Sequence, residues 1–384
     1  MSCSKIFSGD LPELMNDIIK YLQNDFSTLH SCILVNRLWC RLAIPLLWEN
    51  PFSIPTENYN FIEIYLNNLS NDLKSELNEY KINDNLLPSN TLFNYPIFLE
   101  YLNTWKFISS IGKWFETLNP KNRYYLRDSD KHSMFGFKKL ICVLLFKLFI
   151  KNEVNLHIFE IEVTDFNIFN FYLDDILELI LQNPNFIHNI KNLKLYIMVN
   201  SSIYNVKIKS IKNRISEMIP NSHQILKKIV LVLDLIEDMR QKLNYLTIDI
   251  HYITEPNSII LRNLGQKLPL KLEYLCLELN IYTNDFEIFL KNSQYTFINK
   301  LVIKNTSGDH DNMLSCIKEN IMKKKRVKYL AIMDAVFDEY NTISENIDLF
   351  SLENEVKEFE FYNIIVREYI DLKFNLTDIS FEKI

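Results

Sequence analysis

Glycine is scarce in this sequence, and its distribution limits the chemistry that the chain can perform. The 384 residues include only five glycines, and no two of them lie close together: Gly9, Gly112, Gly136, Gly265 and Gly308. A phosphate-binding loop needs clustered glycines, because its backbone must approach the anion closely. The sequence therefore argues against nucleotide-dependent catalysis of the P-loop, Rossmann or kinase type, and we expect no cofactor.

Paired cysteines are missing as well. The six cysteines form no C-x-x-C pair and no regular framework, and most lie in apolar segments: Cys3, Cys32, Cys40, Cys142, Cys276 and Cys316. This scatter is typical of reduced, buried thiols in the cytosol or nucleus, and not of a disulfide scaffold or a zinc site. We therefore expect a cytoplasmic location, a nuclear location or both.

Long apolar runs and an excess of one charge are also absent. The most apolar stretch, Leu140–Ile150, is interrupted by Lys147 and is shorter than the roughly 20 residues that span a bilayer, so we predict a buried helix there. Met1–Phe7 lacks the charged start and apolar core of a signal peptide. With 42 basic and 48 acidic side chains and a formal charge of −6, the chain favours neither nucleic acid nor an anionic membrane as a partner.

What the sequence does contain is enough apolar material for a large core. Hydrophobic residues make up 48% of the chain, and its length exceeds that of a usual single domain, so two or three folded units are expected. The patterns described next divide it into residues 1–51, a mostly helical connecting region 52–152, and residues 153–384. The connecting region suggests no function.

The stretch Asp10–Pro51 carries the sharpest local pattern. Asp10 is a suitable N-cap, Glu13 completes a capping box, and Pro12 stands in the first turn, where its missing N–H is not needed. These signals predict a helix whose apolar residues recur at helical spacing: Leu14, Ile18, Ile19 and Leu22.

Two further helices are predicted after it. Asn24 and Asp25 interrupt the pattern with turn-forming side chains, so the second helix should begin near Ser27. The third helix should end before Pro45, and its apolar stripe is Val35, Leu38, Trp39, Leu42 and Ala43. Three short helices in about 40 residues are too small to bury all of this apolar surface among themselves. Part of it is therefore expected to contact a partner.

These residues resemble the F-box family, whose pattern runs from an L-P pair through a short apolar helix to V-x-x-x-W and a closing L-W. The matching positions are Leu11-Pro12, Ile18 with Leu22, Val35 to Trp39, Leu42, and Leu47-Trp48. The L-P pair alone is common, whereas the ordered set within one short stretch is specific.

The resemblance implies that this stretch docks on a Skp-family adaptor, which hangs from a cullin scaffold carrying the ubiquitin-transfer machinery. The residues that it places at or beside the adaptor interface are Leu11, Pro12, Ile18, Ile19, Leu22, Val35, Trp39 and Leu42. The alternative is that the same residues pack against the rest of this chain, and for each single residue both interpretations stay open.

A repeat organises residues 153–384. The segment Leu272-x-x-Leu275-x-Leu277-x-x-Asn280 matches the core pattern of a leucine-rich repeat without a mismatch. Looser copies begin at Leu156, Ile190, Leu243, Ile298, Val327 and Val356. The long gap before Leu243 holds Gln224–Gln241, which we predict to be one helix with Leu226, Ile229, Val230 and Leu233 facing inward.

Each copy is predicted to form one short strand followed by a helical or irregular return. Stacked copies give an α/β fold, a degenerate leucine-rich-repeat-like solenoid with a curved parallel sheet. If Leu275 and Leu277 face the core, Tyr274 and Glu278 face the concave, solvent side, and equivalent tyrosines form a row. The residues that we expect to bind a target protein are Tyr245, Tyr274, Tyr329, Glu278 and Tyr362. Tyrosine also suits an exposed strand face through cross-strand packing, so this simpler interpretation stays open.

Other candidate sites are weaker. Asp309-His310-Asp311 has ligand-type side chains but follows Ser307-Gly308 in a repeat turn, so a solvated loop is expected. Lys323–Arg326 could be a nuclear import signal, yet it closes the predicted helix Asn312–Met322, where cations complement the helix dipole. No spacing of acidic residues or histidines makes a metal site or a nucleophile triad convincing, so we expect no metal, no catalytic residue and no enzyme.

The sequence therefore predicts a substrate-recognition adaptor of an SCF-type cullin ubiquitin ligase. Its expected partners are a Skp-family adaptor, a cullin and a target protein, and they include neither nucleic acid nor a membrane. The alternative is a leucine-rich-repeat-like interaction scaffold with no link to ubiquitin transfer, in which the first helices only cap the solenoid.

Overall fold

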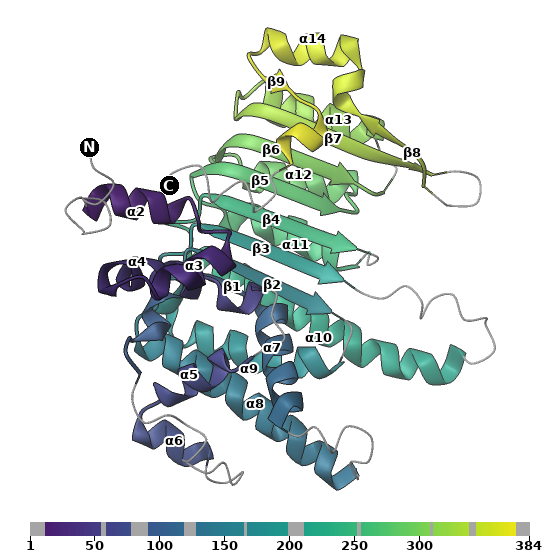
Figure 1. Cartoon of the computed structure of the whole chain (residues 1–384). Coiled ribbons are helices and arrows are strands. Elements are labelled where there is room, and N and C mark those ends of the chain that lie inside the picture. The colour runs from purple at the N-terminus through teal and green to yellow at the C-terminus, as the bar shows by residue number, and fades with distance from the viewer. Residues whose placement is uncertain are drawn as a thin grey trace. The chain divides into compact units, whose positions relative to one another are not determined.

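The structure of the chain is a computed structural model, and it divides into two compact units, Met1–Phe159 and Glu160–Ile384 (Figure 1). It describes residues 12–54, 59–77, 91–118, 128–164, 167–198, 211–251, 255–307, 310–337 and 343–373. Across these ranges the protein is a mixed α/β protein with a largely parallel sheet. The three-part division expected from the sequence stays a prediction, because unit 1 contains both of its first two parts.

Unit 1 is almost entirely helical. Its elements are α2 (Pro12–Lys20), α3 (Phe26–Ile33), α4 (Arg37–Trp48), the 3-10 turn η1 (Pro51–Ser53), α5 (Phe61–Asn67), α6 (Asn71–Leu77), the 3-10 turn η4 (Tyr95–Phe98), the short strand β1 (Tyr101–Asn103), α7 (Thr104–Leu118) and α8 (Asp128–Lys151). The backbone oxygen of Glu100, next to β1, accepts hydrogen bonds from the N–H groups of His157 and Ile158.

Side-chain caps explain where the second and third helices begin. Asp25 precedes α3, and its carboxylate accepts hydrogen bonds from the backbone N–H of Thr28 at 3.0 Å and from the Thr28 hydroxyl at 2.6 Å. Asn36 precedes α4, and its side-chain oxygen accepts from the N–H groups of Leu38 at 2.9 Å and Trp39 at 3.0 Å. Each cap satisfies N–H groups that have no partner inside the helix. Val35 therefore lies in the turn before α4, and the prediction that it begins the third helical stripe is wrong.

The prediction that Pro45 ends the third helix is also wrong. Helix α4 continues through Pro45 to Trp48. A proline inside a helix costs about 3 kcal/mol, because its ring removes one hydrogen bond and crowds the preceding turn. Packing beyond the proline offsets this cost: the Trp48 ring lies 5.2 Å from the Tyr65 ring and 4.2 Å from the Tyr95 ring.

Aromatic rings and helix α8 form the core of unit 1. The Phe52 ring lies 5.9 Å from that of Tyr65 and 5.0 Å from that of Phe107, and Tyr65 lies 5.3 Å from Phe149. The apolar run of α8 is buried, which confirms the helix predicted there: Ile141, Cys142, Leu144, Leu145, Phe146, Leu148 and Phe149. None of the helices that the structure describes has both the length and the apolar character needed to cross a bilayer.

Unit 2 is built on strands that follow one another in space as they do in the sequence. They are β2 (Ile158–Thr164), which starts just before the unit, β3 (Asn192–Met198), β4 (Tyr245–His251), β5 (Lys271–Leu279), β6 (Phe297–Asn305), β7 (Val327–Phe337), β8 (Ile343–Asp348) and β9 (Ile365–Val366). Strands β3 to β7 pair in parallel, β8 runs antiparallel to β7, and β9 pairs parallel to β7.

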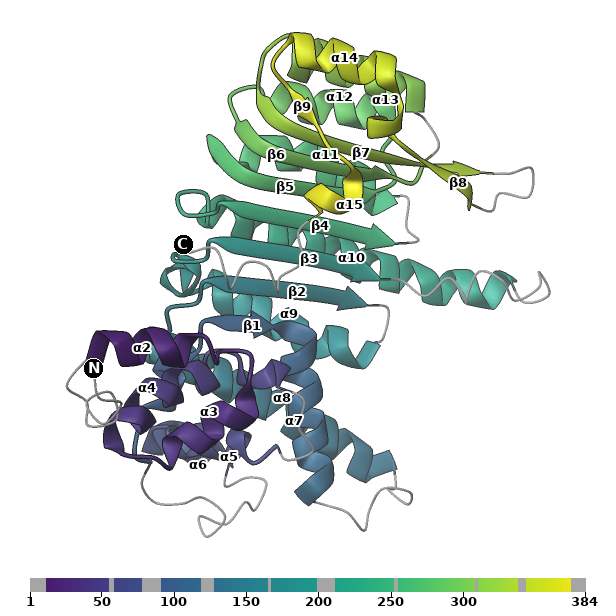
Figure 2. The ribbon, with the colours of Figure 1, turned by 45° about the horizontal axis from the view of Figure 1, so that its top comes forward.

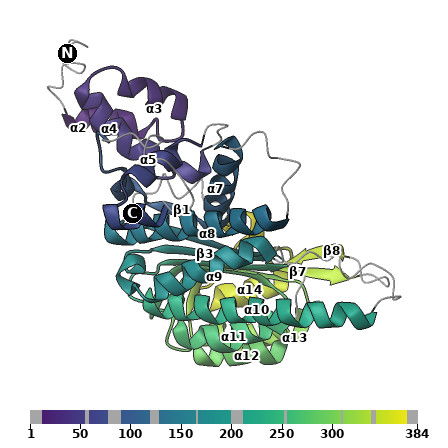
Figure 3. The ribbon, with the colours of Figure 1, turned by 90° about the horizontal axis from the view of Figure 1, so that it is seen from below.

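Helices cover one face of this sheet (Figure 3). Between the strands the chain forms α9 (Asn167–Leu181), the 3-10 turn η6 (Pro184–Ile187), α10 (Ile211–Asp238), α11 (Glu255–Lys267), α12 (Thr283–Asn292), α13 (His310–Ile317) and the π-helix η8 (Lys318–Met322). After β8 it forms the 3-10 turn η9 (Leu349–Ser351), α14 (Glu353–Phe361) and α15 (Tyr369–Leu372). The long helix predicted at Gln224–Gln241 corresponds to α10, although Val230, which was expected to face inward, is 48% exposed.

The strand register follows the repeat. One buried row runs across the parallel strands through Leu193, Leu246, Leu275, Leu301 and Leu330. Strands are present at the six predicted copies from Leu156 to Val327, and the core-facing side of Leu275 and Leu277 is confirmed by their complete burial. The period of two in these segments therefore predicted both the strands and their inner face.

The seventh copy was predicted to be a strand, and this prediction is wrong. Val356–Phe361 lies in helix α14, where Phe359 is fully buried and Phe361 is 83% exposed. Residues two apart point in different directions on a helix, which explains this difference. Glu353 and Glu355 in the first turn favour the helix through its dipole. The strand that pairs with β7 in this part of the chain is β9, which runs parallel to it with Ile365 beside Tyr329.

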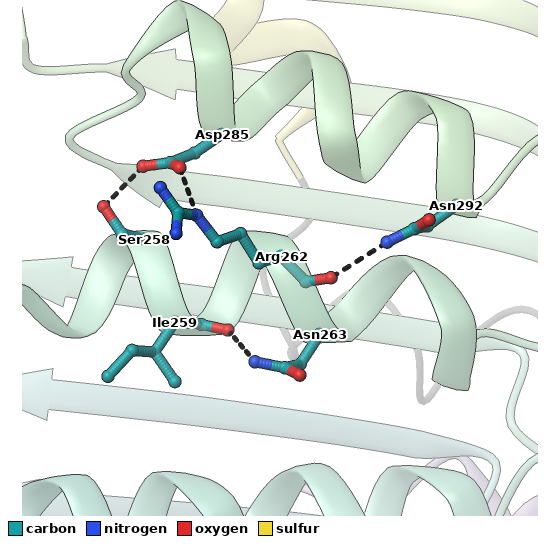
Figure 4. A network of polar contacts seen from close by, with 6 residues as sticks. All are labelled: Ser258, Ile259, Arg262, Asn263, Asp285 and Asn292. Atoms are coloured by element: carbon teal, nitrogen blue, oxygen red, sulfur yellow. Dashed lines mark hydrogen bonds and ion pairs between the residues drawn. The ribbon is translucent and has the colours of Figure 1, made fainter.

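Helices α11 and α12 approach each other closely at Gly265, and a polar network joins them (Figure 4). The buried carboxylate of Asp285 on α12 accepts a hydrogen bond from the Ser258 hydroxyl and pairs with Arg262 Nε at 2.6 Å. The Asn292 side-chain amide donates to the Arg262 backbone oxygen at 3.0 Å. These contacts fix the spacing of two successive helices, which lie before and after strand β5 in the chain.

Arg326 has a structural role that the sequence did not suggest. Its side chain is buried, and its guanidinium donates to the backbone oxygens of Leu290 at 3.0 Å, Thr296 at 3.3 Å and Ser293. It therefore satisfies carbonyl groups at and just after the end of α12, which have no partner inside the helix. In the basic run Lys323–Arg326 only Arg326 is buried, whereas the three lysines are exposed.

Candidate functional site

The N-terminal helices of unit 1 form their own small core. Ile19, Leu29, Cys32 and Ala43 are buried together, and Leu22, Trp39 and Leu42 pack against them while staying partly exposed. Four of the predicted adaptor-binding residues, Ile19, Leu22, Trp39 and Leu42, thus take part in packing within the three helices. Leu11 lies outside the described residues, and Pro12 opens α2.

Other apolar side chains of these helices face outward. Ile18 is 36% exposed and Val35 is 52% exposed, so the structure leaves both available for a partner. Three more exposed residues here were not among the predicted adaptor-binding residues, namely Leu14, Tyr21 and Leu34, of which Tyr21 is 88% exposed. The signal was present, because Leu14, Ile18 and Tyr21 recur at the spacing of one helix face. We call Leu14, Ile18, Tyr21, Leu34 and Val35 the N-terminal apolar set.

A polar contact ties the end of α2 to the end of α4. Gln23 Nε2 donates to both carboxylate oxygens of Glu49 at 2.8 Å, and the Glu49 backbone oxygen accepts from the N–H groups of Glu100 and Tyr101. Burial, together with the negative charge of Glu100, raises the pKa of Glu49 to about 7. This contact holds the loop after α2 in place and so positions the helix that carries Leu14 and Ile18.

The predicted tyrosine row exists on the face of the sheet opposite the helices. Tyr245 pairs with Tyr274 across β4 and β5, and Tyr274 is connected through Lys300 to Tyr329 on β7. The alignment is confirmed, but the expectation that Tyr274 faces solvent is wrong, because it is only 3% exposed. Tyr245 and Tyr329 stay partly buried.

A segment near the C-terminus covers part of this face (Figure 2). Tyr369 and Leu372 of α15 pack in one apolar cluster with residues of three strands. These are Tyr274 and Cys276 of β5, Val302 of β6 and Ala331 of β7. Glu278, also expected to be exposed, is 4% exposed and pairs with Lys373 Nζ at 2.6 Å. The alternation of inward and outward residues along each strand placed these residues on the correct face. It could not show that another part of the chain covers them.

Tyr362, the last predicted target-binding residue, does not belong to the row. It caps the end of α14, because the segment expected to be a strand is a helix. The role of all five residues in target binding stays a prediction, and the geometry brings four of them, Tyr245, Tyr274, Tyr329 and Glu278, onto one sheet face.

The face carries a group of carboxylates, of which only Glu278 was among the predicted site residues. Burial raises the pKa of the Tyr196 hydroxyl, and the negative charges of four carboxylates on β2, β4 and β5 raise it further. These carboxylates are Glu160, Glu162, Asp249 and Glu278. Lys194 Nζ lies 3.6 Å from Glu160 Oε1, and both side chains are nearly buried. Burial lowers the pKa of Lys194, and the nearby Glu160 carboxylate opposes this shift. The parity that revealed the tyrosines would have shown these residues on the same face.

Other predicted sites offer little chemistry in the structure. Asp309 is outside the described residues, as are the side chains of His310 and Asp311, and the described part of the chain holds no cluster of three potential metal ligands. None of the five cysteines that the structure describes forms a disulfide. Cys276 is buried in the sheet face, and burial raises the pKa of its thiol, which opposes reactivity.

Comparison with known proteins adds no relative to this picture. No family model, no curated protein and no solved structure matches the chain.

Proposed function

We propose that this protein is a substrate-recognition adaptor of an SCF-type cullin ubiquitin ligase. The N-terminal helices would dock on a Skp-family adaptor, and the sheet face of unit 2 would hold a target protein. In this role the chain is a non-catalytic subunit: it raises the concentration of the target near the ubiquitin carrier and makes or breaks no covalent bond itself.

The single observation that carries the proposal is the N-terminal apolar set. Ile19, Leu29, Cys32 and Ala43 already close a core between α2, α3 and α4, so the exposed residues are not needed to hold these helices together. Leu34 is 78% exposed and Leu14 is 42% exposed. Leu14, Ile18 and Tyr21 recur at the spacing of one helix face and are all exposed, and several large apolar side chains exposed on one face are typical of a protein-binding site. The ordered F-box-like pattern of the same helices indicates which partner to test.

A capture experiment with purified Skp adaptor tests the proposal. The double variant Ile18→Glu with Val35→Glu places charges on two exposed positions and should lose capture, because a buried unpaired carboxylate costs several kcal/mol at an interface. Leu92 is also in unit 1 and is 91% exposed, so Leu92→Glu is the matched control and should bind like the wild type. Equal thermal unfolding of the three proteins shows that the fold is kept.

The same experiment separates the alternative function, an interaction scaffold without any link to ubiquitin transfer. That alternative is favoured by the packing of Trp39 and Leu42 against the core of the three helices, which is what a purely structural cap would show. Failure of the wild-type chain to capture the adaptor would support the scaffold. Capture that survives the double variant would likewise reject docking through these residues.

A further inference from the structure

The C-terminal part of the described chain leaves the edge of the sheet and crosses onto its open face. Strand β9 pairs with β7 through only two residues, and the N–H of Arg367 then donates to the Leu330 backbone oxygen at 2.9 Å. The Tyr369 N–H donates to Asp348 Oδ2 at 2.8 Å. This hydrogen bond fixes the first residue of α15 at the point where the chain turns onto the face.

Two apolar side chains of this segment enter the face. Tyr369 is 4% exposed and Leu372 is 8% exposed, and both belong to one cluster with Tyr274 and Cys276. The residues between them point away, since Ile370 is 76% exposed and Asp371 is also exposed. The segment therefore contacts the sheet through positions three and four residues apart, as the anchor residues of a helix bound in a groove do.

The third contact is ionic. Lys373 Nζ lies 2.6 Å from Glu278 Oε1 and 5.5 Å from the centre of the Tyr369 ring. Glu278 is buried, and further carboxylates of the face, Asp249 and Glu160, lie near it around Tyr196. A buried carboxylate is costly without a cationic partner. The buried Glu278 carboxylate therefore favours a ligand that brings a positive charge beside an aromatic ring, as Lys373 and Tyr369 do.

We infer that the sheet surface under Tyr369–Lys373 is the target-binding surface, that this segment occupies it as an internal ligand, and that the target supplies an aromatic side chain followed four residues later by a lysine. This inference rests on the proposed target-binding role of the sheet face. It narrows the expected target to a peptide segment that reproduces the apolar and ionic contacts of Tyr369 and Lys373.

The internal ligand is suited to displacement. Helix α15 has four residues, which is far below the length at which an isolated helix is stable in water. Its position depends on β9 and on the side chains of Tyr369, Leu372 and Lys373. A segment with so few contacts opens at a much lower free energy than the sheet beneath it, so a target needs only to compete with the local concentration of the tethered segment.

Peptide binding to the full-length protein tests the inference. The probe is a fluorescent synthetic peptide with the sequence of Ile365–Lys373, and binding is measured by anisotropy. The variant Tyr369→Ala with Lys373→Ala frees the surface and should bind the peptide about tenfold or more tightly than the wild type, in which the tethered segment competes. Ile370→Ala changes an exposed neighbour in the same segment and should bind like the wild type.

Changes in the probe and in the sheet test the chemistry. A peptide carrying glutamate in place of its lysine, or alanine in place of its tyrosine, should lose most of its affinity for the freed surface. Glu278→Gln in the same background should reduce the preference for lysine over glutamate. Equal affinity of wild type and double variant, or equal binding of the lysine and glutamate peptides, would overturn the inference.

A second variant covers the case in which the double variant loses its cooperative unfolding. Lys373→Ala keeps Tyr369 and Leu372 in their cluster, and a gain in affinity for the lysine peptide of about threefold or more supports the inference, whereas no gain overturns it. Both variants should capture the Skp adaptor as the wild type does, because the N-terminal apolar set is unchanged. If the variants do not bind the peptide more tightly than the wild type but still capture the adaptor, the inference alone is rejected. If they bind the peptide as predicted but do not capture the adaptor, as the wild type also does not, the proposed function alone is rejected.

Discussion

Glu49 shows how one carboxyl makes the stability of unit 1 depend on pH. Burial is the main cause that raises its pKa from 4.5 to about 7, so the folded protein holds this proton more tightly than the unfolded chain. The resulting stabilisation is present below pH 4.5 and is lost as the pH rises toward about 7. We expect the free energy of unfolding to fall by on the order of 1 to 2 kcal/mol across this window, less than the full shift implies because the carboxyl is partly exposed.

Urea unfolding of the wild type and of Glu49→Gln across that pH range measures this effect. The glutamine keeps a side chain that can hydrogen-bond Gln23 and has no proton to lose, so the decline should disappear. Glu13→Gln, at an exposed position, is the control and should show the same decline in stability with rising pH as the wild type. An unchanged decline in Glu49→Gln would assign the pH dependence to another group.

Arg326 allows a second prediction at the level of single residues. Arg326→Met removes the donor that serves Leu290, Ser293 and Thr296, and buried carbonyls without donors should destabilise unit 2 by about 2 to 4 kcal/mol in urea unfolding. Lys324→Met alters the exposed neighbour and should stay within about 0.5 kcal/mol of the wild type. Similar effects of the two changes would mean that Arg326 acts only as a surface charge.

Between elements, the contact of α11 with α12 predicts the sign of a helix substitution. In an exposed helix, glycine to alanine stabilises by about 1 kcal/mol. A Cβ at Gly265 would instead lie 2.7 Å from the Phe289 oxygen and 2.8 Å from Asn292 Cβ, so Gly265→Ala should destabilise unit 2 by about 1 to 3 kcal/mol. Gln266→Ala, at an exposed position on the same helix, is the control for the effect of helix propensity alone. Stabilisation by Gly265→Ala would show that the helices separate at little cost.

The packing of α9 with α10 contains a buried charge that yields another prediction. Lys228 is fully buried, and its Nζ lies 2.7 Å from Asp174 Oδ1. Asp174→Ala leaves the ammonium buried without this partner and should cost about 3 to 5 kcal/mol in urea unfolding, whereas the double change Asp174→Ala with Lys228→Met should recover most of that loss. A double variant as unstable as Asp174→Ala would mean that the loss comes from packing and not from charge.

At the same scale, some elements could be predicted from the sequence and others could not. Alternating apolar residues, mostly leucine and isoleucine, identified strands β2 to β7 and their inner face, because that period has few structural alternatives. Val356 and Phe359 are three residues apart, a spacing shared by a repeat strand and a helix, and the helix-favouring Glu353 and Glu355 settle the choice. Pro45 ends a helix only where nothing beyond it packs well enough to offset its cost, and sequence periodicity does not report that packing.

For the whole molecule, the limits of the sequence lie in contacts between distant segments. The outward apolar side of α2 could be read from Leu14, Ile18 and Tyr21, because it is a local pattern. The burial of Tyr274 and Glu278 depends on Tyr369 and Lys373, which lie 95 residues later in the sequence, and no local period connects them. The candidate sheet face was therefore located from the sequence, but the segment that covers it and the ion pair between Lys373 and Glu278 were not.

The most direct test of the central claim is a calorimetric titration of the purified full-length chain with purified Skp adaptor. We predict a one-to-one complex with a negative heat-capacity change, because the N-terminal apolar set leaves water on binding. We also expect that Ile18→Glu with Val35→Glu abolishes this signal while Leu92→Glu keeps it. A wild-type chain that gives no binding heat at several temperatures, and no complex by size-exclusion chromatography, would contradict the account.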